Sequence, residues 1–225
     1  MSAGIRAAQT VLRYCPNLPI HLATDVKSFE TIFSKSTWPF SSIEKIENSH
    51  RRSKVDYFPQ TPFDNTLYLD TDTALNADIR DSFRILERFD IALCHAHRRN
   101  TARGKISWRT QIPPAFPEFN SGVILFRKTP SVIQVFQDWS TCYRESGHTH
   151  DQPTLRELLW LSDVRIATLP PEFNVRMIKY QFLWSKSEAT VKIFHLKRFH
   201  RGWANWLFRH PQRKLDRLRR RLGIH

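Results

Sequence analysis

The sequence predicts an α/β domain with a mainly parallel or mixed central β-sheet, and three observations predict it. Short apolar runs alternate with segments of helical periodicity over most of the 225 residues. Hydrophobic residues make up 40% of the chain, which is enough to fill a globular core. Asp70, Asp72 and His195 follow or end apolar runs, and the ligands of α/β proteins gather at the carboxyl ends of strands.

Each element is predicted from its own pattern. Helices are expected where apolar residues recur three and four positions apart, at 5–14, 26–35, 78–87, 131–143 and 153–161. Strands are expected where short apolar runs lie between polar or turn residues, at 19–24, 66–69, 90–94, 122–126, 164–169 and 191–195. Residues 36–53 are polar and irregular apart from the segment IEKIE. Residues 95–118 are rich in Arg, Pro and His and are expected to form a functional loop.

Positive charge is concentrated at the C-terminus. The formal net charge is +14, of which the segment 192–225 carries +10. Leu215, Leu218 and Leu222 recur at helical spacing among arginines, and Trp203 and Trp206 precede them. A basic amphipathic helix beside aromatic residues suits an anionic membrane surface, which we favour over nucleic acid. A helix packed on the domain with a solvated basic face is the plain alternative. We therefore expect a domain at 1–196 and a basic aromatic tail at 197–225.

Several classes of protein are excluded. No apolar run approaches the roughly 20 residues of a membrane span, and the N-terminal residues MSAGIRAAQT lack the apolar stretch of a secretory signal. The three cysteines are dispersed and form no CxxC pair, which argues against a disulfide framework and a zinc ribbon. We expect a cytoplasmic protein, held peripherally at the inner membrane face by its tail.

The turn Asp70-Thr71-Asp72 follows the apolar run TLYL. If the strand's pleat continues, both carboxylates face the same way, and a hard divalent cation, Mg²⁺ or Mn²⁺, would relieve their repulsion. An EF-hand fails at Ala74, Leu75 and Asp81. A haloacid-dehalogenase-like phosphatase with Asp70 as nucleophile fits in part, although Ala74 stands where Thr or Val is expected. The structural alternative is that the two aspartates cap the following turn and helix.

Seven segments, in this order and spacing, resemble those of GT-A fold nucleotide-diphospho-sugar transferases, and those of the glycogenin-like branch in particular. They are PNLPIHLATD, PFDNTLYLDTDTAL, DSFRILERFDIAL, FNSGVILFRKT, HDQPTLRELL, LPPEFNVR and VKIFHL, within residues 5–196. The resemblance implies a Rossmann-like three-layer sandwich, a nucleotide-sugar donor, most simply a UDP-sugar, and Mn²⁺ or Mg²⁺ as cofactor. It also implies a strand ahead of residue 5, which we expect to be missing.

The resemblance assigns roles to the acidic turn and to the late histidine. It implies that Asp72 chelates the metal that bridges the donor's diphosphate. Asp70 would touch the same metal and the ribose, and His195 would be a third ligand, although a lone histidine at a strand end is often structural. Lys54 would contact the donor, and Lys197 is one of several basic residues that could neutralise phosphate.

The resemblance also implies a sugar site. Asn120, Ser121 and Gly122 match a turn that lines it, and Asp151 and Gln152 match a pair near the transferred sugar. A plain turn before a strand is the alternative for the first three residues. For Asp151 it is the cap of the helix beginning at Pro153.

These features predict a metal-dependent glycosyltransferase that transfers a sugar to a hydroxyl acceptor, on a glycan or a lipid-linked molecule. The resemblance favours retention of anomeric configuration; inversion would require a base, for which Asp151 is the first candidate. The main alternative is a non-catalytic GT-A-like protein whose tail binds membrane or nucleic acid.

Overall fold

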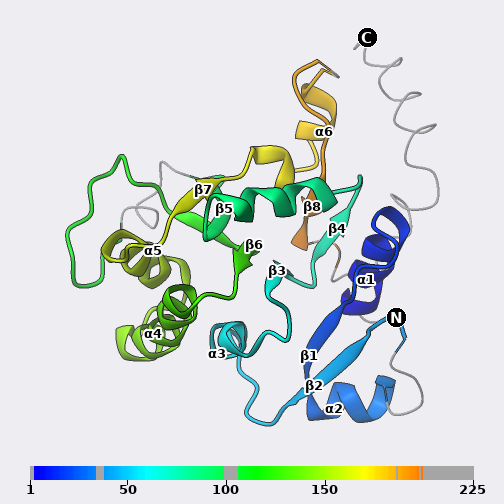
Figure 1. The fold of residues 1–225 in the computed structure, drawn as a ribbon, viewed down its shortest axis with the longest axis horizontal. Coiled ribbons are helices and arrows are strands. Elements are labelled where there is room, and N and C mark those ends of the chain that lie inside the picture. The colour runs from blue at the N-terminus through cyan, green and yellow to red at the C-terminus, as the bar shows by residue number, and fades with distance from the viewer. Residues whose placement is uncertain (1–2, 34–37, 99–105, 186, 198, 200–225) are drawn as a thin grey trace. The chain divides into compact units, whose positions relative to one another are not determined.

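A computed structural model describes residues 3–33, 38–98, 106–185, 187–197 and 199. The chain divides into two compact units, each assembled from separate segments, and each is described by itself (Figure 1). The first unit contains Met1–Leu18, Asp70–Arg80 and Pro171–His225. The second contains Pro19–Leu69 and Asp81–Pro170. The boundary predicted at residue 196 stays a prediction.

A four-stranded mixed sheet forms the centre of the second unit. Its strands are β3 (Asn65–Leu69), β6 (Phe119–Arg127), β5 (Ile91–His95) and β7 (Ile166–Thr168), in that spatial order. β6 runs antiparallel to both neighbours, whereas β5 and β7 are parallel. Ile91–Cys94 and Ser121–Phe126 are buried, as expected of strands that read as continuous apolar runs.

Two helices, α4 (Pro130–Ser146) and α5 (Gln152–Leu161), pack against each other in this unit. The side chain of Thr129 caps α4 by accepting a hydrogen bond from the Val132 backbone, and Gly147 ends the helix in a left-handed conformation with φ of 62°. The core joins the buried face of α4 to the sheet and to the short elements α3 (Lys54–Tyr57) and η2 (Phe58–Gln60). Trp139 and Phe136 are its largest fully buried aromatic residues on α4.

The second unit also contains a separate pair of parallel strands, β1 (His21–Asp25) and β2 (Ser42–Ile46). β2 overlaps the segment IEKIE, for which no strand was predicted. The prediction of a single α-helix at 26–35 was wrong, because α2 (Val26–Ser28) is followed directly by the π-helical η1 (Phe29–Phe33). The segment predicted at 78–87 is a 3₁₀-helix, η3 (Arg80–Glu87).

The first unit is built from α1 (Ala3–Tyr14), a two-stranded antiparallel sheet and two short helices. The strands are β4 (Thr73–Leu75) and β8 (Ile193–His195), and the helices are η5 (Pro171–Phe173) and α6 (Tyr180–Leu183). α1 joins β4 through the Thr10 hydroxyl, which accepts a hydrogen bond of 2.9 Å from the Leu75 backbone. A small apolar core, which includes Ala74, Val175 and Phe194, lies beneath β4 and β8.

Most of the predicted elements are present, and the fold class is confirmed as α/β with a mixed sheet. β4, α3 and α6 were not predicted, because each is only three or four residues long and shows no periodicity. Among the described residues, no helix is both long and apolar enough to span a membrane.

Candidate metal centre and buried carboxylate

The acidic turn Asp70–Asp72 belongs to the first unit. Its geometry is set by hydrogen bonds to backbone carbonyls. The Asp70 carbonyl accepts one from the Thr73 amide (3.0 Å) and one from the Thr73 hydroxyl (2.7 Å). The Asp72 carbonyl accepts from the Leu196 amide at 2.9 Å. The prediction of a continuing pleat was therefore wrong, since the chain turns at Asp70 and begins a strand of another sheet at Thr73.

His195 reaches the acidic turn because β8 runs antiparallel to β4. Its Cα pairs with that of Thr73, so the last residue of β8 lies beside the first residue of β4. The His195 Nε2 atom is 3.0 Å from Asp72 Oδ1 and 3.5 Å from Asp70 Oδ2. The predicted three residues therefore converge, although the strands are not parallel and the site is not at the shared carboxyl ends of a parallel sheet.

This cluster is largely removed from solvent. His195 is 2% exposed and Asp72 7%, whereas the Asp70 side chain is 25% exposed. One ligand atom from each residue lies within 4.8 Å of the other two. Burial raises the pKa of the Asp72 carboxyl, but the hydrogen bond and charge of His195 outweigh it, so the pKa is lowered overall. Asp72 is therefore an anion at neutral pH.

The orientation of the imidazole suits a metal ligand. His195 Nδ1 lies 2.8 Å from the Asn174 Oδ1 atom, which places a proton on Nδ1 and turns Nε2 toward the two carboxylates. When Nε2 is unprotonated, two carboxylate oxygens and an imidazole nitrogen are three acceptors facing one another. Such a set requires a positive charge between them, either a proton on Nε2 or a divalent cation. This donor set fits Mn²⁺ well and Mg²⁺ through its oxygens.

A second polar cluster belongs to the second unit and surrounds Asp151, which is 1% exposed. Ser121 donates its hydroxyl hydrogen to Asp151 Oδ2 at 2.6 Å. Arg52 Nη1 lies 3.3 Å from Oδ1, and Lys54 Nζ lies 3.4 Å from Oδ2. We call Arg52, Lys54, Ser121 and Asp151 the carboxylate clamp.

Asp151 occupies the N-cap position of α5, but its side chain makes no capping hydrogen bond. The capping interpretation was therefore wrong. Burial raises the pKa of the Asp151 carboxyl, but the combined effect of Lys54, Arg52 and the Ser121 hydroxyl is larger and opposite. The pKa therefore lies below its ordinary value. A carboxylate held in this way stays ionised and is a weak general base near neutral pH.

The remaining predicted sugar-site residues lie next to the clamp in the chain. Asn120 and Gly122 lie inside β6, so the interpretation as a turn before a strand was wrong; the Asn120 Oδ1 atom accepts from the Gly122 amide at 3.1 Å. Gln152 donates to the Phe119 carbonyl at 3.2 Å. Lys54 also donates to the Ser121 carbonyl at 2.9 Å. Lys197 lies in the first unit and is exposed.

Sequence reasoning missed three polar residues of the two clusters. Asn174 orients His195, and it lies within the recognised segment LPPEFNVR. Arg52 precedes Lys54 by two residues and was given no role, yet it contacts Asp151 and also lies 3.1 Å from His150 Nδ1. His150 carried only the weak signal that it precedes Asp151.

A comparison with protein-family models identifies one family. A family model described as nucleotide-diphospho-sugar transferase matches residues 43–216. A sequence search of curated proteins returns no match.

Solved structures with a similar fold include three glycosyltransferases. The galactosyltransferase LgtC, in complex with donor and acceptor sugar analogs, aligns with a TM-score of 0.60 at 15% identity, over 87% of this chain and 82% of LgtC. Mouse xyloside xylosyltransferase 1 aligns with a TM-score of 0.54 at 15% identity, over 86% of this chain and 90% of its own. GlyE of Streptococcus pneumoniae TIGR4 aligns with a TM-score of 0.56 at 18% identity, over 96% and 60%. At these identities the likeness concerns the fold alone.

Proposed function

The chain belongs to the nucleotide-diphospho-sugar transferase family and has the GT-A fold, and we propose that it is a metal-dependent glycosyltransferase. The proposed reaction transfers a sugar from a nucleotide-diphosphate donor, a UDP-sugar in the simplest case, to a hydroxyl group of a glycan or a lipid-linked acceptor. The observation that carries the metal dependence is the convergence of Asp70, Asp72 and His195 within 4.8 Å.

In this proposal the first unit supplies the metal ligands. Asp70, Asp72 and His195 would hold Mn²⁺ or Mg²⁺, and Asn174 would keep Nε2 of His195 unprotonated and directed at the ion. A divalent cation bound there would neutralise negative charge that develops on the departing diphosphate. We also propose that Asp70, the most exposed of the three, contacts the donor ribose.

The second unit supplies the carboxylate clamp. Lys54 is proposed to contact the donor, and Asn120, Ser121 and Gly122 to line the sugar site. Asp151 and Gln152 are proposed to act near the transferred sugar. Because the pKa of Asp151 is lowered and two cations hold its oxygens, we assign it electrostatic stabilisation rather than proton abstraction. The weak basicity of Asp151, the first candidate for a base, supports the proposal of a retaining reaction.

Calorimetry with nucleotides tests this proposal. UDP, GDP and CDP are titrated into the protein with Mn²⁺ and with EDTA, for the wild type and for Asp70→Ala/Asp72→Ala. We expect one nucleotide to bind only in the presence of metal, and the double variant to lose that binding. The matched control is Asp78→Ala, which removes an exposed carboxylate of the same unit that pairs with Arg80.

Two results would replace the proposal. If no nucleotide binds the wild type under either condition, the non-catalytic GT-A-like alternative takes its place. If the protein instead releases phosphate from an aryl phosphate, and Asp70→Asn abolishes the release, the phosphatase interpretation is correct.

Membrane association is a separate proposal that depends on sequence alone. Apart from Lys197 and Phe199, the basic tail lies outside the described residues. We propose that it binds anionic lipid and so places the enzyme near a membrane acceptor. Sedimentation with phosphatidylserine vesicles tests this: the full chain should pellet and a chain ending at residue 196 should not. Pelleting of the shortened chain would contradict the proposal.

A further inference from the structure

Asp56, in the second unit, lies at the centre of a polar network that the proposed reaction does not use. It lies on α3, and its side chain is 22% exposed. Three donors from two parts of the chain converge on it: His50 Nε2 at 2.7 Å from Oδ2, Arg144 Nη1 at 3.1 Å from Oδ1, and the Ser140 hydroxyl on Oδ1. Burial raises the pKa of Asp56, but Ser140, His50 and Arg144 outweigh it and lower the pKa overall, so Asp56 is an anion.

Through His50, Asp56 holds the turn that precedes α3. The Nδ1 atom of His50 accepts a hydrogen bond of 3.2 Å from the Arg52 amide, while Nε2 donates to Asp56. The turn is closed by Ser53, whose hydroxyl accepts from the His50 amide at 2.6 Å and donates to the His50 carbonyl at 2.8 Å. The imidazole thus links the carboxylate of Asp56 to the backbone of Arg52.

Both cations of the carboxylate clamp lie in or directly after this turn. Arg52 lies within the turn, and Lys54 is the first residue of α3. Helix α4 supports both sides of the arrangement with adjacent residues. Trp139 donates its indole hydrogen to the Asp151 carbonyl at 2.8 Å, while Ser140 holds Asp56. Helix α4 therefore fixes the position of Asp151 through Trp139. Through Ser140, Asp56 and His50, it also holds the segment that carries Arg52 and Lys54.

We propose that Asp56 is a positioning residue that holds Arg52 and Lys54 against Asp151. In the described contacts its carboxylate meets His50, Ser140 and Arg144, and it acts on the clamp through His50 and α3. The consequence for donor binding rests on the proposed function; the mechanical link between Asp56 and Asp151 does not.

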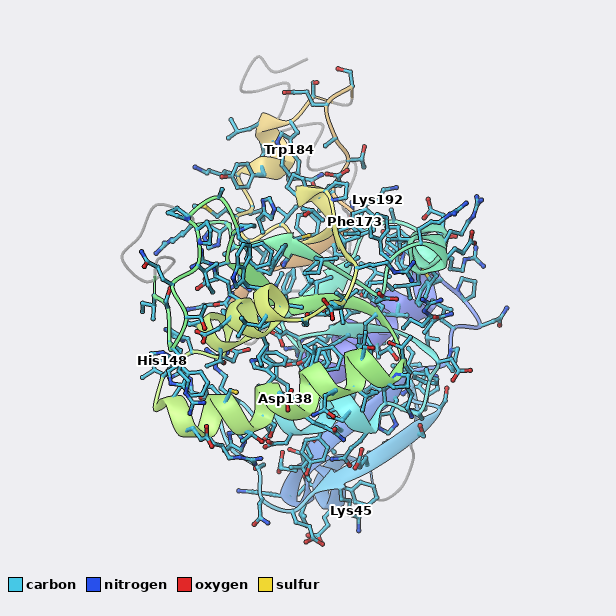
Figure 2. The ribbon with its side chains drawn as sticks, turned by 60° about the vertical axis from the view of Figure 1, so that its left-hand side comes forward. Lys45, Asp138, His148, Phe173, Trp184 and Lys192 are labelled. Atoms are coloured by element: carbon cyan, nitrogen blue, oxygen red, sulfur yellow. The ribbon has the colours of Figure 1, made fainter. Side chains whose placement is uncertain are left out.

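Asp56→Asn is the informative substitution. An asparagine of the same size turns one carboxylate oxygen into an NH₂ group, which would face a donor whichever way the amide turns. The His50 side or the Ser140–Arg144 side of the network then loses its acceptor. In either orientation the negative charge is gone, so the hold of residue 56 on His50 and on the turn at 50–53 is weakened. The matched control is Asp138→Asn on α4, the helix that carries Ser140 (Figure 2). Among the described contacts, Asp138 accepts only a local hydrogen bond from Gln134, at 2.9 Å.

A double-mutant cycle without ligand tests the mechanical link. Urea midpoints are measured for Asp56→Asn, Asp151→Asn and the pair. We expect the double variant to lose clearly less stability than the sum of the losses in the two single variants. The reason is that Asp56→Asn already weakens the interactions that Asp151→Asn removes. The cycle of Asp138→Asn with Asp151→Asn should be additive. Additivity in both cycles would overturn the proposal.

Ligand binding separates positioning from general loss of structure. By calorimetry with Mn²⁺, Asp56→Asn should bind UDP within about twofold of the wild type with unchanged stoichiometry, and bind the UDP-sugar about tenfold more weakly. Equal weakening of both ligands, or none, would overturn the role in donor binding. If the wild type binds no nucleotide, the proposed function fails, and the double-mutant cycle alone still decides whether Asp56 positions the clamp.

Discussion

The two acidic clusters neutralise their carboxylates in different ways. Asp151 is almost fully buried and faces two permanent cations, Arg52 and Lys54, from its own unit. Asp72 is buried beside a second carboxylate, Asp70, and an imidazole whose positive charge depends on a proton. The carboxylate clamp contains its own permanent counter-charge, whereas the cluster of Asp70, Asp72 and His195 would be stabilised by a cation supplied from solution. This difference predicts opposite responses to metal and to loss of a carboxylate.

Loss of a metal ligand should have the largest effect. Asp72→Asn should lower the kcat/KM for the nucleotide-sugar donor by about 10²- to 10³-fold, because charge on the leaving diphosphate would no longer be neutralised. The free energy of unfolding measured in EDTA should fall by less than in Asp151→Asn, because the lost interaction with His195 is partly offset by relief of the repulsion from Asp70. Steady-state donor hydrolysis measures the first quantity and urea denaturation the second. A normal rate in Asp72→Asn would remove the metal site from the mechanism.

Loss of the clamped carboxylate should instead destabilise the fold. Asp151→Asn leaves Arg52 and Lys54 partly buried without a counter-charge and should cost about 3 kcal/mol of unfolding free energy. Urea denaturation in EDTA measures this cost, with Asp138→Asn as the control. Metal-dependent UDP binding at the other cluster should persist in the folded variant. A cost no larger than that of the control would show that the clamp contributes nothing to stability.

Ligand should stabilise the protein only through the cluster of Asp70, Asp72 and His195. At about 100 times the Kd, Mn²⁺ with UDP should add about 2.7 kcal/mol to the free energy of unfolding and raise the Tm. Asp151→Asn should retain this gain and Asp72→Asn should lose it. Thermal denaturation with and without EDTA makes the comparison. A gain that survives in Asp72→Asn would mean that the ligand binds elsewhere.

The smallest effect should appear at acid pH. Because the folded-state pKa of Asp151 is lowered, its ionic stabilisation is complete above the unfolded value of about 3.9 and is lost as the pH falls through the folded pKa. The difference in unfolding free energy between wild type and Asp151→Asn should therefore be constant above about pH 5 and shrink below about pH 4. Urea denaturation at a series of pH values measures it. A constant difference down to the lowest pH would contradict the lowered pKa.

The sequence predicted the convergence of the three candidate metal ligands better than its geometry. Asp70, Asp72 and His195 were marked by apolar runs and by the family resemblance, and the structure brings them together. The reasons given were a continuing pleat for the two aspartates and, for His195, the gathering of ligands at the carboxyl ends of strands. His195 instead reaches them through an antiparallel pair between β4 and β8. β4 is too short to show periodicity, so no local pattern could predict that pairing.

The clamp was predicted only in part because its contacts join distant segments. Ser121 and Asp151 lay in recognised motifs, but the position of Arg52 depends on Asp56, which meets Ser140 across 84 residues of sequence. A charged residue in a polar segment has no periodicity that reveals its partner. The grouping of α1, the acidic turn and the late histidine in one unit likewise emerges only from tertiary contacts.

Electron paramagnetic resonance of Mn²⁺ tests the central claim most directly. The six-line signal of free Mn²⁺ is recorded as protein is added in the presence of UDP, for the wild type, Asp72→Asn and the control Asp78→Asn. The account predicts that the wild type and Asp78→Asn remove the free signal at a stoichiometry of one ion per chain, and that Asp72→Asn leaves most of it. Equal loss of signal with Asp72→Asn would contradict the assignment of the metal to Asp70, Asp72 and His195.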